Sequence, residues 1–345
     1  MGNANAPAQM GSLDSIGGGG IASMLLANGG NSDCLRICAD DENGDIRNNA
    51  TTTLRKDEWI AMDTALVKAA RLRQNLVSML RARGLRLDLT ALGLSKATLE
   101  WETINDLGDA AMDMDAVTDG GNDSLVFELE GLPLPITHKQ FSLTLRHLLV
   151  SRSGATPLDT ASAESAGFVI GEKIEKTFVN GSSSLSYAGR TLYGLTDFPD
   201  RNTGSVTADW ASATAAQILA DTLAMMQALI DDRMRGPYAI IVPTDTLTNL
   251  NDDYSASGAS ISTIKQRLLG IDGIEEVLFN DHLTSGNVVM LQLTPDVCRI
   301  VETLPLQTVQ WNERGGTIFN YRGWAVTVPQ VRSDQNNRCG VAHYS

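Results

Sequence analysis

The sequence is poor in the residue types on which most catalytic and metal sites depend. Only four cysteines and four histidines occur in 345 residues. The cysteines lack the paired CxxC spacing of a zinc site, and the histidines form no HxxxH or HExxH pair. No Gly-x-Ser-x-Gly elbow or thiol-nucleophile signature is present. We therefore predict no catalytic residue, no metal ligand and no cofactor, and hence a protein that is not an enzyme.

Long apolar runs and a positive net charge are also missing. The longest apolar stretches span a handful of residues, as in 239–242, whereas a membrane helix needs about 20. Residues 1–22 have neither the basic start nor the apolar core of a secretory signal, so we expect no membrane partner and assembly in a cytoplasm. The formal charge of −14 argues against sequence-specific DNA reading, which requires clustered cations. One region is locally basic and contains Lys68, Arg71, Arg73, Arg81, Arg83 and Arg86.

The hydrophobic content, 43% of the chain, is enough to bury a core, and its spacing predicts the elements. Residues 1–53 are rich in Gly, Asn, Asp and Ser and are typical of an extended arm. From Lys56 the apolar residues fall at helical spacing until Gly84, which predicts one long helix. Alternation in 110–117 and 125–130 around a turn-rich segment predicts a β-hairpin.

The remainder reads as a mixture of strands and helices. Residues 132–149 are predicted to be extended, and Asp159 or Thr160 is predicted to cap a helix that runs to Phe178. Residues 180–208 are predicted to be a connection, and Ser212 is predicted to cap the next helix. Further helices are expected from Thr244 and over 261–269, with strands at 238–242, 276–279, 287–293, 297–302 and 317–328 before a polar tail. The predicted fold class is α+β.

Four segments carry a resemblance to a known family: residues 54–59, 132–141, 154–160 and 236–238. Their order and spacing resemble the Hong Kong 97 fold that tailed-phage major capsid proteins and encapsulins share. Residues 54–59, Leu-Arg-Lys-Asp-Glu-Trp, are similar to the start of the encapsulin amino-terminal helix. Residues 132–141, with Arg146 beyond them, resemble the stretch that leaves the family's hairpin. Residues 154–160 resemble the Gly-x-Pro-Leu-Asp segment before its spine helix, and Gly236-Pro237-Tyr238 resembles the first strand of its axial lobe. The resemblance covers about residues 54–329.

The resemblance implies a domain organisation and a function. The expected parts are an N-terminal arm (1–53), an N-terminal helix region (54–95), an E-loop hairpin (96–135), a peripheral domain with the spine helix (136–209 and 303–331), an axial domain (210–302) and a C-terminal tail (332–345). The implied function is self-assembly through hexamers and pentamers into an icosahedral phage head around double-stranded DNA. Portal, scaffold, protease and decoration proteins are the further partners that a phage head implies, and the implied location is the virion.

The predicted sites are contacts between subunits. We expect Met112, Met114, Phe127, Trp59 and Arg146 at such contacts. Cys34, Cys38 and Cys339 are candidates for disulfides between neighbouring subunits. The tip of the hairpin, residues 118–124, contains no lysine, so the covalent cross-link of the founding phage is not expected.

Two alternatives stay open at this point. One is an encapsulin nanocompartment, although the long N-terminal arm and the polar tail favour a viral capsid. The other is a soluble α+β enzyme, which would need a pocket lined by perturbed acids. The sequence offers no candidate residues for such a pocket.

Overall fold

The structure is a computed structural model in which two units are separated between Arg55 and Lys56. It describes residues 38–40, 46–48, 56–104, 112, 114–115, 124–153, 160–253, 262–313 and 317–345. In the first unit, β1 (Cys38–Asp40) pairs antiparallel with β2 (Ile46–Asn48). The second unit, Lys56–Ser345, holds all the elements described below.

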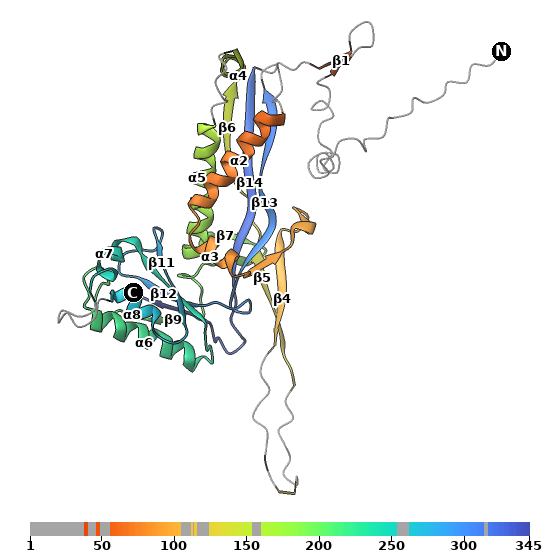
Figure 1. The fold of residues 1–345 in the computed structure, drawn as a ribbon. Helices are drawn as coiled ribbons and strands as arrows, with labels where there is room; N and C mark the ends of the chain where they lie inside the picture. Colours follow the sequence, from red (N-terminus) through yellow and green to blue (C-terminus); the bar gives the residue numbers. More distant parts are fainter. Residues whose placement is uncertain are drawn as a thin grey trace. The chain divides into compact units, whose positions relative to one another are not determined.

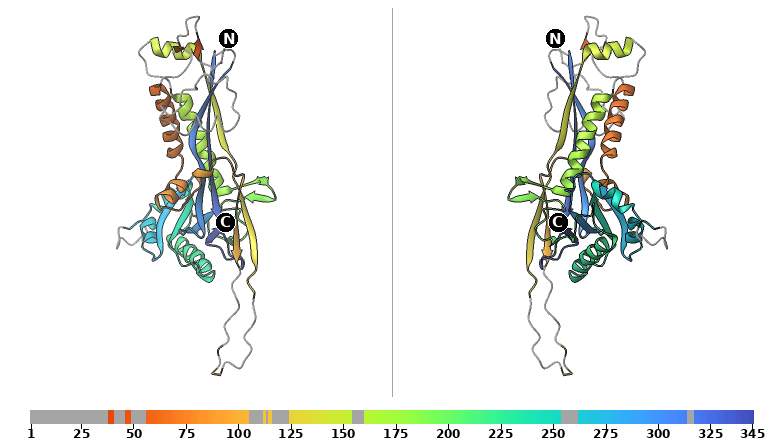
Figure 2. Two further views of the ribbon diagram at one scale, coloured as in Figure 1. Left: turned by 90° about the vertical axis from the view of Figure 1, so that its right-hand side faces the viewer. Right: turned by 90° about the vertical axis from the view of Figure 1, so that its left-hand side faces the viewer.

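Two long helices lie on one face of a four-stranded sheet in the second unit (Figures 1 and 2). They are α2 (Lys56–Leu72) and α5 (Ala161–Asn180). Small residues on α5 let the two backbones approach, because a Cβ atom on Gly167 or Gly171 would overlap a carbonyl oxygen of α2. The predicted spine helix is therefore present. Thr160 is its N-cap residue, but the Thr160 hydroxyl donates to Glu164 and accepts no hydrogen bond from a backbone N–H of the helix.

The first predicted helix is interrupted. α2 ends at Leu72, and α3 (Leu76–Ala82) starts after a short break, so the prediction of one continuous helix is wrong. The cause lies about 100 residues away, because the Glu175 carboxylate of α5 accepts hydrogen bonds from the first backbone N–H groups of α3. Gly84, at φ +73°, follows the end of α3 as predicted.

The four-stranded sheet runs β3 (Arg86–Asp88), β13 (Cys298–Glu313), β14 (Ile318–Val331) and β6 (Thr137–Thr144). β13 and β14 form a long antiparallel hairpin, and β3 joins β13 in parallel. A short helix, α4 (Leu145–Ser153), follows β6, so the expected continuation of the strand to Leu149 is wrong. The 3₁₀ turn η3 (Thr90–Leu92) follows β3.

A five-stranded mixed sheet with helices packed against it occupies most of the predicted axial domain, and we call it the axial sheet. Its strands, in sheet order, are β11 (Ile274–Asn280), β10 (Tyr238–Pro243), β12 (Val288–Gln292), β15 (Val341–Tyr344) and β9 (Asn202–Gly204). Its helices are α6 (Ala215–Asp231), η4 (Thr244–Thr246), α7 (Leu247–Leu250) and α8 (Ile264–Leu269). Every residue of β10 and β12 is buried, as the apolar sequence of β10 and the first four residues of β12 require.

Three predictions about this half of the chain need correction. The polar tail forms β15, which pairs with β12 and β9. The cap of α6 is Thr214, in a capping box with Gln217, and not Ser212. The expected connection after the spine helix contains the hairpin of β7 (Ser182–Tyr187) and β8 (Arg190–Leu192).

Buried side chains form two hydrophobic clusters. One joins α3 and α5 to the long hairpin and to one face of the axial sheet, and it includes Leu80, Phe178 and Ile300. The other lies between the opposite face of the axial sheet and α6, and it includes Trp210 and Ile240. Among the described residues, none of the helices is both long and apolar enough to cross a membrane. The α+β class is confirmed.

Candidate functional site

The main exposed feature is a two-stranded hairpin formed by β4 (Thr98–Ile104) and β5 (Phe127–Pro133). Its antiparallel register places Trp101 opposite Glu130, and Ile104 opposite Phe127. Because side chains alternate along a strand, these two pairs lie on opposite faces of the hairpin. The predicted first strand, 110–117, is wrong for its three described residues, which are not in a strand.

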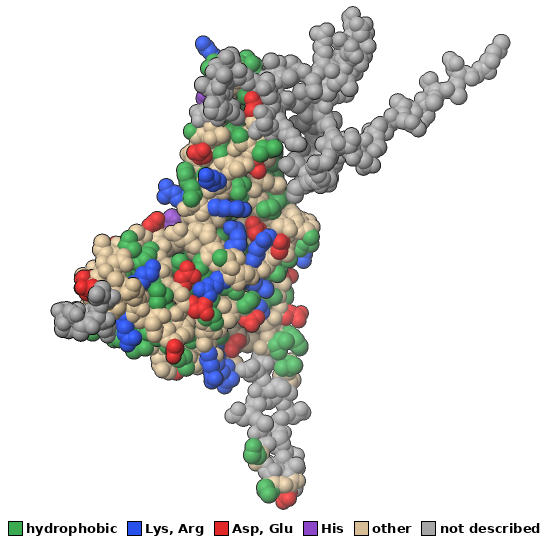
Figure 3. Space-filling model, viewed as in Figure 1, with side chains coloured by type: hydrophobic (Ala, Val, Ile, Leu, Met, Phe, Trp, Pro, Cys, Tyr) green, Lys and Arg blue, Asp and Glu red, His purple; other side chains and the backbone are tan. Residues whose placement is uncertain are grey.

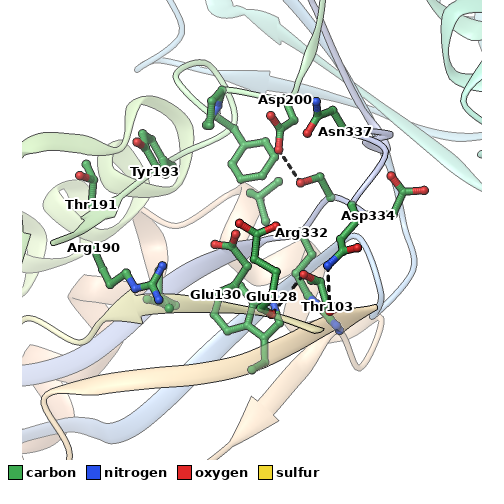
Figure 4. A pocket seen from close by; sticks show the side chains of 18 of the residues that line it. Thr103, Glu128, Glu130, Arg190, Thr191, Tyr193, Asp200, Arg332, Asp334 and Asn337 are labelled. Atoms are coloured by element: carbon green, nitrogen blue, oxygen red, sulfur yellow. Dashed lines mark hydrogen bonds between the residues drawn. The ribbon is translucent and has the colours of Figure 1, made fainter. Parts of the chain in front are cut away.

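We call the face with Trp101, Thr103, Glu128 and Glu130 the inner face, because it lies against the body of the chain (Figure 4). Gln335 donates from its side-chain amide to the carbonyl oxygens of Thr103 and Val126, at 3.3 and 3.2 Å. Arg190 donates to the carbonyl oxygen of Leu129 at 2.5 Å. These bonds fix the base of a hairpin that would be marginally stable alone.

The inner face encloses a polar cavity of about 380 Å³. Its charged lining is mixed, with acids from Glu128, Glu130, Asp200 and Asp334 and cations from Arg190 and Arg332 (Figure 4). The Arg332 guanidinium lies 6.0 Å from the centroid of the Trp101 ring, and Ser333 donates to Asp200 at 2.5 Å. The contacts in this cavity are thus a cation–π contact and a hydroxyl–carboxylate hydrogen bond, and both join separate segments of the chain.

Metal binding has no support in the described part of the chain. No group of three or more His, Cys, Asp or Glu side chains there is arranged to hold a metal ion. The cavity contains no cysteine or histidine, so it also lacks the usual nucleophile and base pairs. Its chemistry is that of a polar joint.

The outer face of the hairpin carries the opposite kind of side chain. Ile104, Phe127 and Leu129 are exposed by 49%, 58% and 48%. Met112 and Met114, beyond the strands, are each 98% exposed. Contiguous exposed apolar side chains are typical of protein contact surfaces. Phe127, Met112 and Met114 thus lie where a neighbour could reach them, and their role in a subunit contact remains a prediction.

The other two predicted contact residues differ in their surroundings. Trp59 is partly buried, with its ring centroid 6.2 Å from that of Tyr321, so much of its surface already packs within the chain. Arg146 is exposed on α4. It lines a shallow apolar hollow with Leu145, Leu149, Val150 and Thr317. Arg146 therefore suits a contact better than Trp59 does.

The structure argues against a disulfide between subunits through Cys339. Its side chain is 0% exposed, and burial raises the pKa of the Cys339 thiol to about 12. Cys298 is also buried, with its pKa raised to about 12 by burial and by the neighbouring Cys339. Cys34 lies outside the described residues, and only the backbone of Cys38 is described. Both remain candidates for a disulfide between subunits.

Sequence reasoning missed a buried polar joint around Glu175. This carboxylate is 2% exposed and accepts from the backbone N–H groups of Leu76 (2.6 Å) and Val77 (3.2 Å) and from the Asn280 side chain (2.8 Å). Burial raises the pKa of Glu175, although these donors and the backbone N–H of Asn75 act to lower it. The joint ties α5 to α3 and to the end of β11.

The comparisons with known proteins identify a family. Residues 48–344 match the sequence profile of a family of unknown function, DUF6260. The chain belongs to the DUF6260 family. Among curated proteins, none matches this DUF6260 chain.

Solved structures resemble the DUF6260 chain at low sequence identity. The virus-like particle protein of Pyrococcus furiosus has a TM-score of 0.58 and 12% identity, over 83% of this chain and 99% of that one. The capsid of Myoviridae phage XM1 has a TM-score of 0.61 and 11% identity, over 78% and 92%. The capsid of the native GTA particle has a TM-score of 0.53 and 11% identity, over 85% and 91%. The expected Hong Kong 97-type fold of the DUF6260 chain is confirmed.

Proposed function

We propose that this chain is the major capsid protein of a tailed-phage-type particle, with a structural and not a catalytic role. Copies would assemble through hexamers and pentamers into an icosahedral head that encloses double-stranded DNA. The mature location would be the virion, after assembly in the cytoplasm of a bacterial host. Portal, scaffold, protease and decoration proteins are the further partners expected of such a head.

The observation that carries the proposal is the asymmetry of the β4–β5 hairpin. Its inner face is bonded to its own chain through Gln335 and Arg190, while its outer face leaves Phe127 and Leu129 exposed. Full burial of such a side chain contributes about 1.5–3 kcal/mol. A fixed element with an exposed apolar face suits repeated contact with a second copy, and many such contacts stabilise a closed shell together.

The fold likeness to capsid proteins supports the same proposal. The likeness to the Pyrococcus furiosus particle also keeps an encapsulin-type compartment as the second candidate. The two candidates differ in content, because a head encloses DNA and a compartment encloses protein cargo. The acidic charge of the chain, −14, suits a head whose packaged DNA is held loosely and without sequence preference.

The test is negative-stain electron microscopy of the purified chain with size-exclusion chromatography. We expect closed shells or capsomer rings for the wild-type chain and fewer of them for a Phe127→Asp, Leu129→Asp double variant. Nucleic acid in native particles would support a phage head, and enzyme cargo would support the second candidate. A monodisperse monomer or dimer at high concentration, even with neighbouring genes co-expressed, would refute both.

A further inference from the structure

A second hollow, on the helix side of the long β-hairpin, is basic. It has a volume of about 220 Å³ and lies where α2, α3 and α5 meet β13 and β14. Its charged lining consists of Arg71, Arg81 and Arg86 and one acid, Glu302. Its apolar walls are Val67, Ala70, Ile174, Pro305, Leu306 and Ala325. Three cations thus face one anion in a chain that is acidic overall.

The single acid is already neutralised. Glu302 is 7% exposed, and it pairs with Arg86 at 2.9 Å and with Arg81 at 3.7 Å. Each guanidinium has five N–H donors in a planar fork, so these two pairs leave donors unused. Arg86 also pairs at 2.6 Å with Asp88, which lies outside the lining, so two acids offset two of the three cations and Arg71 supplies the remaining positive charge.

Two further donors line the hollow without a partner. Arg71 makes no ion pair within the described part of the chain, and the Gln74 side chain makes no hydrogen bond there. Gln74 is only 5% exposed, and a buried amide normally has a partner. No Gln74 atom is among the fully buried polar atoms that lack a partner, so the amide reaches the space of the hollow and can donate to an acceptor there.

The surroundings extend the basic character. Arg71 also lines the neighbouring hollow along α2, whose charged lining is Lys68, Arg71 and one acid, Asp63. In Figure 3, lysine and arginine side chains gather over the middle of the molecule, with aspartate and glutamate side chains among them. Apolar walls concentrate the field of such charges on a small volume, which raises the local concentration of anions.

We propose that this hollow, which we call the Arg71 hollow, binds a phosphate group of the enclosed nucleic acid. A phosphate offers several acceptor oxygens, which match a guanidinium fork and an amide from different sides. The inference rests on the proposed function, since a phage head is what brings DNA to this surface. Free phosphate shares the same chemistry and is separated from nucleic acid by the experiment below.

The main experiment compares two single-charge variants of the unassembled full chain. Arg71→Gln removes a cation from the hollow, and Arg83→Gln removes one nearby that pairs with Glu275 and Glu276. Affinity for a fluorescein-labelled DNA duplex is measured by fluorescence anisotropy over a salt series. For Arg71→Gln we expect affinity to fall about threefold to tenfold and the log–log salt slope to shrink by roughly 0.9. For Arg83→Gln we expect a smaller loss, of less than about twofold.

Folding is checked separately, because Gln74 is buried whereas Arg71 is exposed. The free energy of unfolding of Arg71→Gln should lie within about 0.5 kcal/mol of the wild-type value. Gln74→Leu, which keeps the buried volume, should weaken DNA binding and leave the salt slope unchanged. Equal affinity and slope for wild type and Arg71→Gln would overturn the proposal.

Competition separates the sources of the anion. Inorganic phosphate at matched ionic strength should displace the duplex from the wild type more effectively than from Arg71→Gln. Polyglutamate that competes as well as phosphate would overturn the choice of phosphate in favour of an acidic peptide. Shells that form but bind DNA independently of Arg71 would refute this inference and leave the proposed function intact, whereas absence of shells would refute the function itself.

Discussion

Replacement of Glu175 by alanine should destabilise the folded chain more than any surface change. The substitution leaves three donors without an acceptor: the backbone N–H groups of Leu76 and Val77 and the Asn280 amide. They surround a side chain that is 2% exposed, so water does not reach them freely. Each stranded donor costs about 1–3 kcal/mol, and water entering the new cavity recovers part of this cost. We expect a loss of about 3 kcal/mol, or roughly 5 °C in Tm for a unit that spans Lys56–Ser345.

The measurement is urea and thermal unfolding of the unassembled chain by circular dichroism. Concentration is kept low, because assembly would add to the apparent stability. The matched control is Glu172→Ala on the same helix, where an exposed carboxylate pairs with Arg73 at 3.6 Å. That pair contributes at most about 1 kcal/mol. Equal losses for the two variants would refute the role assigned to Glu175.

The same carboxyl predicts a pH dependence. Burial raises the pKa of Glu175 above 4.5 in the folded chain. Between pH 4.5 and the folded-state pKa, the folded chain therefore binds more protons than the unfolded chain. The contribution of Glu175 to the free energy of unfolding is thus fully present below pH 4.5 and declines as the pH rises through the folded-state pKa. Glu175→Gln cannot titrate, so the stability of the wild type relative to this variant should fall over that range. A constant difference would contradict the assignment.

Three other predictions address the hairpin, the helix contact and the buried thiols. Phe127→Ala should change the free energy of unfolding by less than about 0.5 kcal/mol but raise the concentration needed for assembly roughly fivefold, as measured by light scattering. Trp101→Ala should instead lower the free energy of unfolding, and the reverse pattern would contradict the assignment of faces. Gly171→Ala should cost about 1–3 kcal/mol in unfolding, because the new methyl overlaps α2, and a neutral result would show that the helices can separate freely. Cys339 should resist iodoacetamide in the folded chain and react in urea, as judged by peptide mass spectrometry, and rapid native labelling would contradict its burial.

The elements that local pattern predicts are those whose burial is periodic along the chain. The pattern predicts α5 because its small and apolar residues repeat at helical spacing, and it predicts β10 because every residue in it is apolar. The turn predicts the hairpin, but the alternating methionines place its first strand at the wrong residues. β4 carries Glu100 and Glu102 between its apolar residues and looks less strand-like than the alternating methionines further along.

The missed features are produced by contacts between distant segments. The break before α3 depends on Glu175, and β15 is a strand because β12 and β9 flank it. The ties at the base of the hairpin come from Gln335 and Arg190, in segments that look like a tail and a connection. The sequence shows the cluster of basic residues that includes Arg71. It does not show that Glu302, far away along the chain, pairs with Arg86 and Arg81 of that cluster.

The hydrogen bonds from Gln335 and Arg190 also explain how the β4–β5 hairpin can expose an apolar face and still keep its conformation in a single, unassembled chain. A free two-stranded ribbon would have to be ordered at the moment of contact, and the entropy lost would reduce the affinity of that contact. Gln335 and Arg190 fix the base of the hairpin from its inner face, so part of this cost is met when the chain folds. The outer face is then presented in one orientation. Gln335→Ala should therefore weaken assembly, even though Gln335 lies on the opposite side of the hairpin from Phe127. In the double variant with Phe127→Ala, the loss of assembly free energy should be smaller than the sum of the two single losses. The reason is that a contact that is already misaligned loses less when its apolar anchor is removed.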